Sequence, residues 1–184
     1  MEINILMTIQ ELRTAFLDFL FSHVTLLGDN GILWIVVGVI LICTKKHRKV
    51  GFLVLFSLLG SFLLGNIFLK NFFERERPCW MYPEMELLIK NPHDYSFPSG
   101  HSMASFAAAT SLWLMNKKWG AAALILAGMI AFSRLYLFVH WPTDVLVGSV
   151  VGILIAVFVF RIVGLTIMER WEYRKGEESS HENV

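Results

Sequence analysis

The sequence contains few charged residues and few cysteines, and each shortage excludes a class of protein. Only 17% of its 184 residues are charged, whereas a soluble domain carries about 25%, and 55% are hydrophobic. With 15 Phe and 6 Trp, the chain has more apolar surface than a soluble domain of this length buries. A bilayer must therefore supply part of its apolar environment. The length fits one domain, and we expect residues 1–184 to form it.

Charge and cysteine content exclude further classes. The net charge is +1, so bulk charge indicates no nucleic-acid partner. Cys43 lies in an apolar run and Cys79 in a polar loop, and we expect neither to form a disulfide. No group of acidic residues offers the oxygen cage that Mg²⁺ prefers. We predict no metal and no cofactor, and the sequence leaves the oligomeric state open.

Five apolar runs approach the length of a membrane-spanning helix, about 20 residues. They cover residues 32–44, 52–69, 103–115, 121–139 and 142–164. The third run is rich in Ala and Ser, which is typical of a helix packed against other helices rather than lipid. We therefore predict an all-α integral membrane protein, with a bundle of five transmembrane helices as a helical core over residues 30–165.

The N-terminal segment has a different pattern. Between residues 3 and 27, apolar side chains recur at spacings of three to five, with charged residues between them. This pattern predicts an amphipathic helix within residues 1–28, lying in the membrane interface. A spanning helix is the alternative, because residues 16–27 are strongly apolar.

Basic residues predict the orientation of the spans. Residues 45–49 carry four Lys or Arg between the first two spans, and Lys117 and Lys118 lie between the third and fourth. Both hairpins should be cytoplasmic by the positive-inside rule. Residues 70–101 and 139–143 then meet on the opposite side, and residues 166–184 form a cytoplasmic tail. The prediction is a multi-pass cell-membrane protein.

Ionisable residues gather at three span ends on that opposite side. The clusters are Lys70 with Arg77, then Ser99-Gly100-His101, and then Arg134, His140 and Asp144. Charges at a membrane are costly and mark function unless they snorkel to the interface. Any one cation could be a snorkelling side chain, but three together would repel each other without an anion. Guanidinium groups match phosphate oxygens, so the set favours a phosphate site.

The segment from His140 to Asp144 offers a nucleophile and its partner. Pro142 suits the first position of a helix, which places His140 in the preceding turn and Asp144 in the first helical turn. A carboxylate that holds one imidazole nitrogen leaves the other nitrogen able to attack. The alternative is an ordinary helix start, where an acidic residue favours the positive helix end.

The second cluster, Ser99-Gly100-His101, has two readings as well. Ser99 is a good N-cap and Gly100 permits close backbone approach, which also describes an ordinary capped helix. The free N–H groups of a helix start can instead bind an anion. His101 is then placed to give a proton to a leaving oxygen.

The spacing of these clusters resembles the signature of the type-2 phosphatidic acid phosphatase superfamily. Lys70 is followed after six residues by Arg77-Pro78, then come Pro98-Ser99-Gly100-His101, and then Ser133-Arg134 with His140 after five residues and Asp144 after three more. The resemblance covers roughly residues 30–165. It implies a core of about six helices, so the usual N-terminal span is either absent here or replaced by residues 3–27.

The resemblance also implies roles for these residues. His140 matches the nucleophile that forms a phosphohistidine, Asp144 its orienting partner, and His101 the general acid. The phosphate-binding residues of the family match Lys70, Arg77, Ser99, Gly100 and Arg134. No metal is required in this family.

We therefore expect a hydrolase that dephosphorylates a lipid phosphate or diphosphate at the non-cytoplasmic face. Undecaprenyl diphosphate fits that placement best among the lipids on which bacterial relatives act. Phosphatidylglycerophosphate and lipid A phosphate are the alternative substrates. A lipid phosphotransferase of the same fold and a non-enzymatic anion or lipid transporter are the alternative functions.

Overall fold

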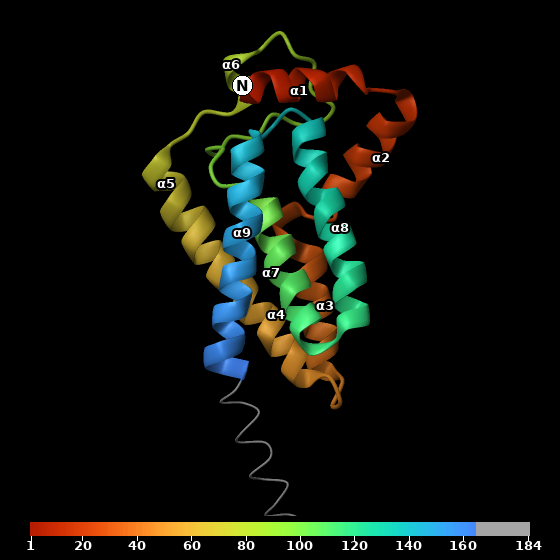
Figure 1. The fold of residues 1–184 in the computed structure, drawn as a ribbon, viewed down its shortest axis with the longest axis vertical. Helices are drawn as coiled ribbons and strands as arrows, with labels where there is room; N and C mark the ends of the chain where they lie inside the picture. The colour runs from red at the N-terminus through yellow and green to blue at the C-terminus, as the bar shows by residue number, and fades with distance from the viewer. Residues whose placement is uncertain (165–184) are drawn as a thin grey trace, which may run out of the picture.

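A computed structural model describes residues 1–164, and within this range the chain forms helices and no strand (Figure 1). This agrees with the all-α prediction. The tail predicted over residues 166–184 lies outside the described residues.

The prediction of one amphipathic helix over residues 3–27 is wrong, because two helices occupy this segment. Helix α1 spans Glu2–Glu11 and helix α2 spans Ala15–Leu26. Thr14 separates them: its backbone is extended, and its hydroxyl accepts a hydrogen bond from the Leu17 N–H, as an N-cap does. Helix α1 lies across one end of the bundle, and α2 descends from it (Figure 1).

Helix α2 continues the bundle rather than lying across it. A short 3₁₀ turn, η1 (Asp29–Gly31), connects it to α3 (Ile32–Cys43). The two helices bend by 43° and together are long and apolar enough for one broken span. Of the N-terminal segment, α1 alone therefore has the position expected of an interfacial helix.

The remaining helices form the rest of the bundle. They are α4 (Arg48–Ser61), the π-helical stretch η2 (Phe62–Leu69), α5 (Lys70–Phe73), α6 (Pro78–Met81), α7 (Gly100–Met115), α8 (Lys117–Tyr136), α9 (Pro142–Val159) and the π-helical stretch η3 (Phe160–Gly164). By length and hydropathy, Arg48–Met81, Lys117–Tyr136 and Pro142–Ile162 can cross a membrane, and the bent pair makes up to four spans. The expected count of five is not confirmed, because α7 has only 16 residues and is too short to count as a span by the same measure.

Helix α7 runs through the middle of the bundle, where α4, α8 and α9 pack around it. Two glycines of α9 permit its close approach to α7. A Cβ on Gly148 would lie 2.7 Å from the Ser99 carbonyl oxygen, and one on Gly152 would lie 2.3 Å from that of Met103. Small residues four apart are typical of close helix pairs in membranes. This packing places the first turn of α9 beside the start of α7, where the Ser99 N–H donates to the Asp144 carbonyl oxygen at 3.0 Å.

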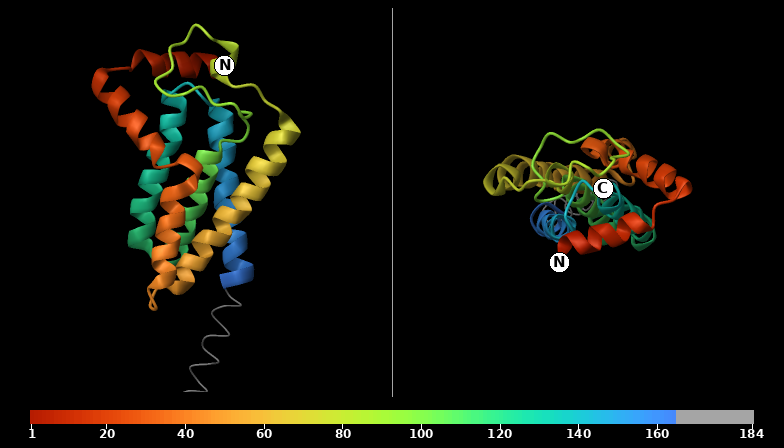
Figure 2. Two further views of the ribbon diagram at one scale, coloured as in Figure 1. Left: turned by 180° about the vertical axis from the view of Figure 1, so that it is seen from behind. Right: turned by 90° about the horizontal axis from the view of Figure 1, so that it is seen from above.

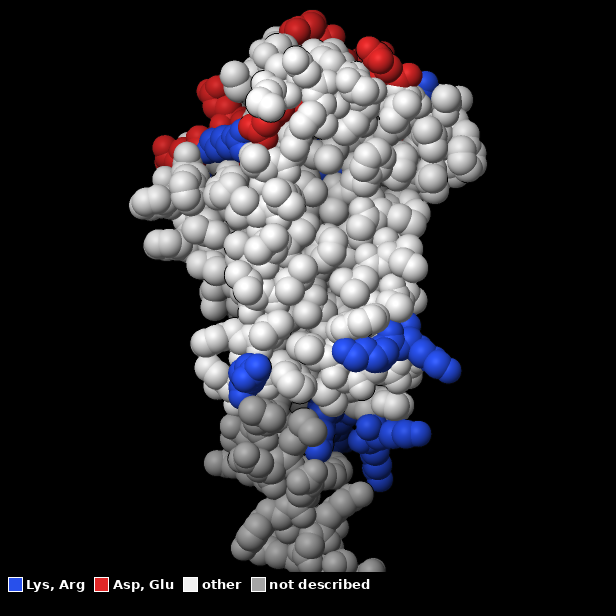
Figure 3. Space-filling view, in the orientation of Figure 1, with Lys and Arg blue, Asp and Glu red and all other residues white. Residues whose placement is uncertain are grey.

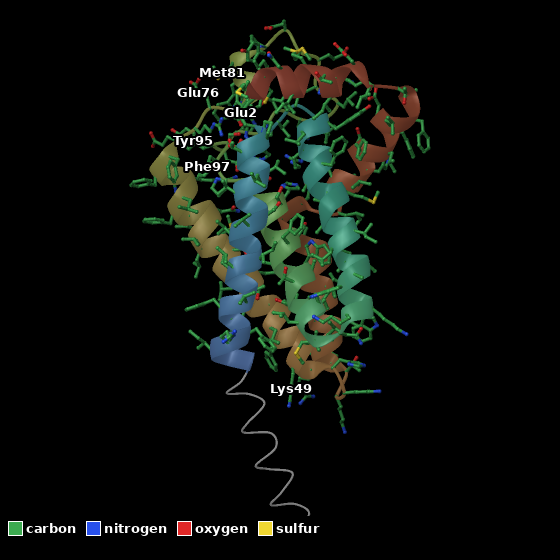
Figure 4. The ribbon with its side chains drawn as sticks, in the orientation of Figure 1. Glu2, Lys49, Glu76, Met81, Tyr95 and Phe97 are labelled. Atoms are coloured by element: carbon green, nitrogen blue, oxygen red, sulfur yellow. The ribbon has the colours of Figure 1, made fainter. Side chains whose placement is uncertain are left out.

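The two ends of the bundle carry opposite charge. Lys and Arg side chains gather at the end away from α1, Asp and Glu at the end that α1 covers, and uncharged residues form the band between them (Figure 3). Lys49 and Glu2 mark these two ends (Figure 4). Large apolar side chains are exposed on the helices between the ends, including Ile125 at 68% and Leu146 at 63%. Such a band suits contact with lipid tails.

Candidate active site

A cavity of about 1050 Å³ lies at the end of the bundle that α1 covers. From above, Figure 2 shows α1 and the segment after α6 both extending over this end. The predicted site residues that line the cavity are Lys70, Arg77, Gly100, His101, Arg134 and His140. Ser99 and Asp144 are fully buried at 0% exposure and are not among its lining residues. The structure thus brings together residues from distant segments, and their catalytic roles stay predictions.

Arg77 is held by the backbone on both sides of the cavity. It is 2% exposed, and it donates to the carbonyl oxygens of Asp94 at 2.7 Å and Val139 at 2.6 Å. The second bond fixes the guanidinium against the turn that carries His140. Arg77 is therefore oriented by the fold, as electrostatic preorganisation requires.

Asp94 is a member of the site that the sequence did not predict. Its carboxylate ion-pairs with Lys70 and accepts from Arg77 at 2.8 Å, so it places negative charge between two of the predicted phosphate-binding residues. Partial burial raises the pKa of Asp94, but the hydrogen bond and charge of Lys70, followed by Arg77, outweigh burial and lower it below its usual value. The cation pair therefore holds a carboxylate in its ionised form.

Arg134 is the third cation, and its hydrogen bonding is incomplete. Its side chain is 4% exposed, and one terminal nitrogen donates to the hydroxyl of Thr25 at 2.5 Å. Its Nε has no hydrogen-bond partner among the residues that the structure describes. A buried donor without an acceptor is costly, and a phosphate oxygen in the cavity would satisfy this one.

His140 lies in the turn between α8 and α9. Phe138 in this turn is left-handed, with φ 59°, which is uncommon for an aromatic residue and reverses the chain. His140 Nε2 lies 3.1 Å from a terminal nitrogen of Arg77. Because guanidinium has no acceptor, Nε2 must accept this bond, and the proton of a neutral imidazole resides on Nδ1.

Burial keeps that imidazole neutral. His140 is 1% exposed, and burial, followed by the positive charges of Arg77 and Arg134, lowers its pKa well below the usual value. A neutral imidazole with its proton on Nδ1 and its lone pair on Nε2 is the form that a nucleophile needs.

Asp144 is more heavily hydrogen-bonded than the sequence indicated. One oxygen, Oδ2, accepts from the Trp141 N–H at 2.8 Å and from the hydroxyl of Ser96, and the other, Oδ1, accepts from Arg75 at 2.6 Å. His140 Nδ1 lies 3.5 Å from Asp144 Oδ2 and 3.4 Å from the Ser96 oxygen. The expected pair is therefore adjacent, but its direct contact is long, and Ser96 joins the two residues.

His101 lies in the first turn of α7, two residues after the N-cap Ser99. The hydroxyl of Ser99 caps the helix by accepting a hydrogen bond from the Ser102 N–H. Gly100 lies close to η2, because a Cβ at this position would be 2.8 Å from Asn66 Oδ1. The imidazole Nε2 of His101 lies 2.8 Å from Asp29 Oδ1. A second histidine–carboxylate pair thus faces the cavity, which Asp29 also lines.

Sequence reasoning missed Thr25, Asp29, Arg75, Asp94 and Ser96. Asp94 and Ser96 lie four and two residues before the Pro98-Ser99-Gly100-His101 cluster, and Arg75 lies two residues before Arg77. Nearness to a motif was therefore an available signal. Asp29 belongs to a Gly-Asp-Asn-Gly segment that reads as a helix break. Thr25 carried no signal at all.

Curated proteins that are similar to this chain in sequence include lipid phosphatases. Undecaprenyl-diphosphatase of Sulfolobus acidocaldarius is 35% identical over 120 residues, which are 65% of this chain and 58% of the relative. The chain thus spans little more than half the length of that relative. Lipid A 4′-phosphatase of Porphyromonas gingivalis is 28% identical over 92% of this chain and 75% of the relative.

Two solved structures have a similar fold. Aquifex aeolicus LpxE superposes with a TM-score of 0.75 and 29% identity, covering 87% of this chain and 94% of that one. The transmembrane phosphatidylglycerolphosphate phosphatase of Bacillus subtilis gives a TM-score of 0.69 and 28% identity, covering 85% and 81%.

Residues 50–167 match the family model of the PAP2 superfamily. This match covers most of the chain, and it includes Lys70, Arg77, His101, Arg134, His140 and Asp144. The protein is therefore a member of the PAP2 superfamily.

Proposed function

We propose that this protein is a membrane-embedded hydrolase that releases phosphate from a lipid phosphate or diphosphate through a phosphohistidine on His140. One observation carries the proposal: Nε2 of a buried, neutral His140 lies among cations that are fixed by the fold. Membership of the PAP2 superfamily supports it, since relatives carry the names of lipid phosphatases.

In the first step, His140 Nε2 attacks phosphorus in line with the leaving oxygen. The N–P bond forms while the P–O bond to the lipid breaks, and its electron pair goes to the leaving oxygen, which takes a proton from His101. For this attack the Arg77 N–H that faces Nε2 must turn to a phosphate oxygen. Asp144 and Ser96 keep the Nδ1 proton directed away from the phosphate.

In the second step, water attacks the phosphohistidine. His101, now deprotonated, takes a proton from the water, the new P–O bond forms, and the N–P bond electrons return to Nε2. Both steps spread charge over three equatorial phosphate oxygens. Lys70, Arg77 and Arg134 neutralise that charge, together with the N–H groups at the start of α7.

The substrate class follows from the position of the cavity. Its lining continues from the cations to apolar side chains of α3 and α4, including Ile35, Leu55, Leu58 and Leu59, so a phosphate with a long apolar chain fits. Undecaprenyl diphosphate is the proposed substrate, which the similarity to an undecaprenyl-diphosphatase supports. Phosphatidylglycerophosphate and lipid A phosphate are the alternatives.

We propose further that the cavity opens on the extracytoplasmic side of the cell membrane. The basic hairpins lie at the opposite end of the bundle (Figure 3), and an excess of Lys and Arg is typical of cytoplasmic loops. The fold would then present the site to lipid phosphates of the outer leaflet.

The test is phosphate release by the purified full chain in detergent, with chelator present. Undecaprenyl diphosphate, undecaprenyl phosphate, phosphatidylglycerophosphate and lipid A are offered separately. We expect release from undecaprenyl diphosphate without added metal, and an acid-labile phosphoprotein after rapid quenching. His140→Ala should lower kcat by at least about 10⁴-fold, because the nucleophile is lost.

Each alternative predicts another result. A phosphotransferase would place labelled phosphate on an acceptor lipid instead of in solution. A transporter would bind the lipid but release nothing, and His140→Ala would bind equally well. Release at the parental rate by His140→Ala would overturn the proposed mechanism, and loss of activity in chelator would overturn the metal-free reaction.

A further inference from the structure

Arg75 contacts the site from outside the cavity and belongs to none of the clusters described above. One terminal nitrogen, Nη1, donates to Asp144 Oδ1 and to the hydroxyl of Thr143, each at 2.6 Å. The other, Nη2, donates to Glu2 Oε2 at 2.5 Å. The guanidinium also lies 5.4 Å from the centre of the Trp141 ring. Arg75 therefore joins the first turn of α1 to the first turn of α9.

Glu2 closes these contacts into a ring. Its Oε1 accepts from the backbone N–H of Thr143 at 3.0 Å and from the Thr143 hydroxyl at 2.7 Å. The Thr143 hydroxyl is therefore both a donor, to Glu2, and an acceptor, from Arg75. Partial burial raises the pKa of Glu2, but the bonds from Thr143 and Arg75 outweigh it and lower the pKa below its usual value. The ring is thus built around an ionised carboxylate.

Apolar packing holds α1 in place independently of this ring. Leu6 is 0% and Ile9 is 9% exposed, and both belong to a cluster with Leu137, Phe138 and other residues of the turn that carries His140. The Gln10 side chain donates to the Tyr136 carbonyl oxygen at 3.1 Å. Helix α1 therefore acts as a strap across this turn (Figure 1), and Glu2 lies at its end beside α9 (Figure 4).

We propose that Glu2 and Arg75 are positioning residues for the nucleophile, so that α1 sets the orientation of Asp144 and through it that of His140. This inference rests on the proposed function. Asp144 is fully buried, and a buried carboxylate needs partners for both oxygens. Without Arg75, Oδ1 loses the hydrogen bond that fixes the rotation of the carboxylate, and the Ser96 and His140 contacts on Oδ2 move with it.

The experiment compares Arg75→Met and Glu2→Gln with the parental full chain in detergent, on a lipid phosphate that the parental protein hydrolyses. A misplacement of about 1 Å at reacting groups costs about 10²-fold. We therefore expect Arg75→Met to lower kcat by about 10- to 100-fold with KM within about twofold, and Glu2→Gln to lower kcat less and in the same way. Arg75→Lys should recover part of the loss, because it keeps the charge without the fork.

Arg13→Met is the matched control. Arg13 lies on the same end of the molecule and ion-pairs with Asp18 at 3.3 Å, yet none of its contacts reaches Asp144. It should keep the parental kcat. Glu2→Gln combined with Arg75→Met should lose clearly less than the product of the single losses, because both act through one ring.

Failure of this inference differs from failure of the proposed function. If the parental protein releases no phosphate, or if His140→Ala remains active, the proposed function is wrong and the ring positions no nucleophile. If the parental protein is active and His140→Ala is not, a parental kcat in both ring variants overturns the ring proposal alone. A rise in KM without a fall in kcat, or an equal loss in Arg13→Met, overturns it as well. Where Arg75→Met does not fold, the milder Glu2→Gln decides.

Discussion

The two histidines that are predicted to be catalytic, His140 and His101, are supported very differently. His140 is 1% exposed, and Asp144 beside it is 0% exposed; Ser96, Arg75 and the Trp141 N–H all bond to that carboxylate. His101 has a side chain that is 20% exposed, and its partner Asp29 is 48% exposed. No other hydrogen bond of the His101 ring is found in the described part of the chain. His140 and Asp144, which we call the nucleophile pair, are thus buried and held by several hydrogen bonds. His101 and Asp29, which we call the acid pair, are partly exposed and joined by one hydrogen bond.

This difference fits the two tasks. A nucleophile must present one lone pair along a fixed line to phosphorus, so its orientation and its neutral form must be secured. A general acid needs only to reach the leaving oxygen, whose position changes with the lipid. Three elements fix the nucleophile, namely the turn after α8, the start of α9 and the strap α1. We expect substitutions in the nucleophile pair to lower kcat more than matching substitutions in the acid pair.

Among substitutions that leave the nucleophile itself in place, the largest effect is expected for Asp144→Asn. The amide keeps the shape of the carboxylate but not the charge that accepts from Arg75 and Ser96, and it can hold the wrong tautomer of His140. We expect kcat to fall by about 10²- to 10⁴-fold, measured at saturating lipid together with the yield of phosphohistidine. Asp18→Asn is the control, because Asp18 bonds to Tyr136 and Arg13 away from the cavity. A loss of only a few-fold would show that Asp144 does not orient His140.

His101→Ala should have the next largest effect, and it should depend on the leaving group. A general acid contributes about 10²- to 10⁴-fold when the leaving oxygen is basic. We expect the rate of phosphohistidine formation, measured in a single turnover, to fall near the lower end for a lipid monophosphate and little for p-nitrophenyl phosphate, whose leaving group needs no proton. Steady-state turnover should fall on both, because His101 also takes the proton from water in the second step. His140→Ala should lose activity on both substrates.

The control for that comparison is His93→Ala, since His93 lines the same cavity. It should behave like the parental protein on both substrates. Equal losses of His101→Ala in the rate of phosphohistidine formation from the lipid and from p-nitrophenyl phosphate would contradict the assignment of His101 as the acid.

A third prediction concerns pH. His140 must be neutral to attack, so kcat/KM falls as the pH drops through its pKa, which burial, Arg77 and Arg134 hold well below the usual value. The parental acid limb should therefore lie below about pH 6.5, the usual histidine value. Arg77→Gln removes one positive charge and should move the limb to higher pH, in addition to lowering the rate at every pH.

The measurement compares normalised pH profiles of the parental protein, Arg77→Gln and His93→Gln. Titration of the substrate is common to all three proteins, so a difference in the acid limb comes from the protein. His93→Gln should leave the limb unmoved. An acid limb that stays in place in Arg77→Gln would show that the neighbouring cation does not control protonation of His140.

The sequence predicted the local structure around the nucleophile pair better than the structure around the acid pair. Pro142 and the residues around it predicted the start of α9, the turn with His140, and Asp144 in the first helical turn, and these positions agree with the structure. They follow from local backbone rules, which act over a few residues. Ser99 as the N-cap of α7 followed from the same kind of rule.

What the sequence could not provide was partnership between distant residues. Glu2 contacts Thr143, 141 positions away in the chain, and Asp29 contacts His101, 72 positions away. No periodicity or spacing relates such residues, because the packing of complete helices brings them together. The break between α1 and α2 was missed since the apolar pattern continues through it, and the N-cap at Thr14 overrides that pattern.

The smallest effect is expected for Asp29→Asn, and it tests the comparison most directly. Asp29 is about half exposed and offers His101 one hydrogen bond at 2.8 Å, so water can replace much of what the carboxylate contributes. One such bond amounts to about 0.5–1.5 kcal/mol, or a loss in kcat of about two- to twelvefold on a lipid monophosphate. Asp18→Asn is the matched control, because it makes the same change away from the cavity. If Asp29→Asn lowered kcat as much as Asp144→Asn, the general acid would have to be positioned as strictly as the nucleophile. The acid pair would then have to become buried around the bound lipid before the reaction.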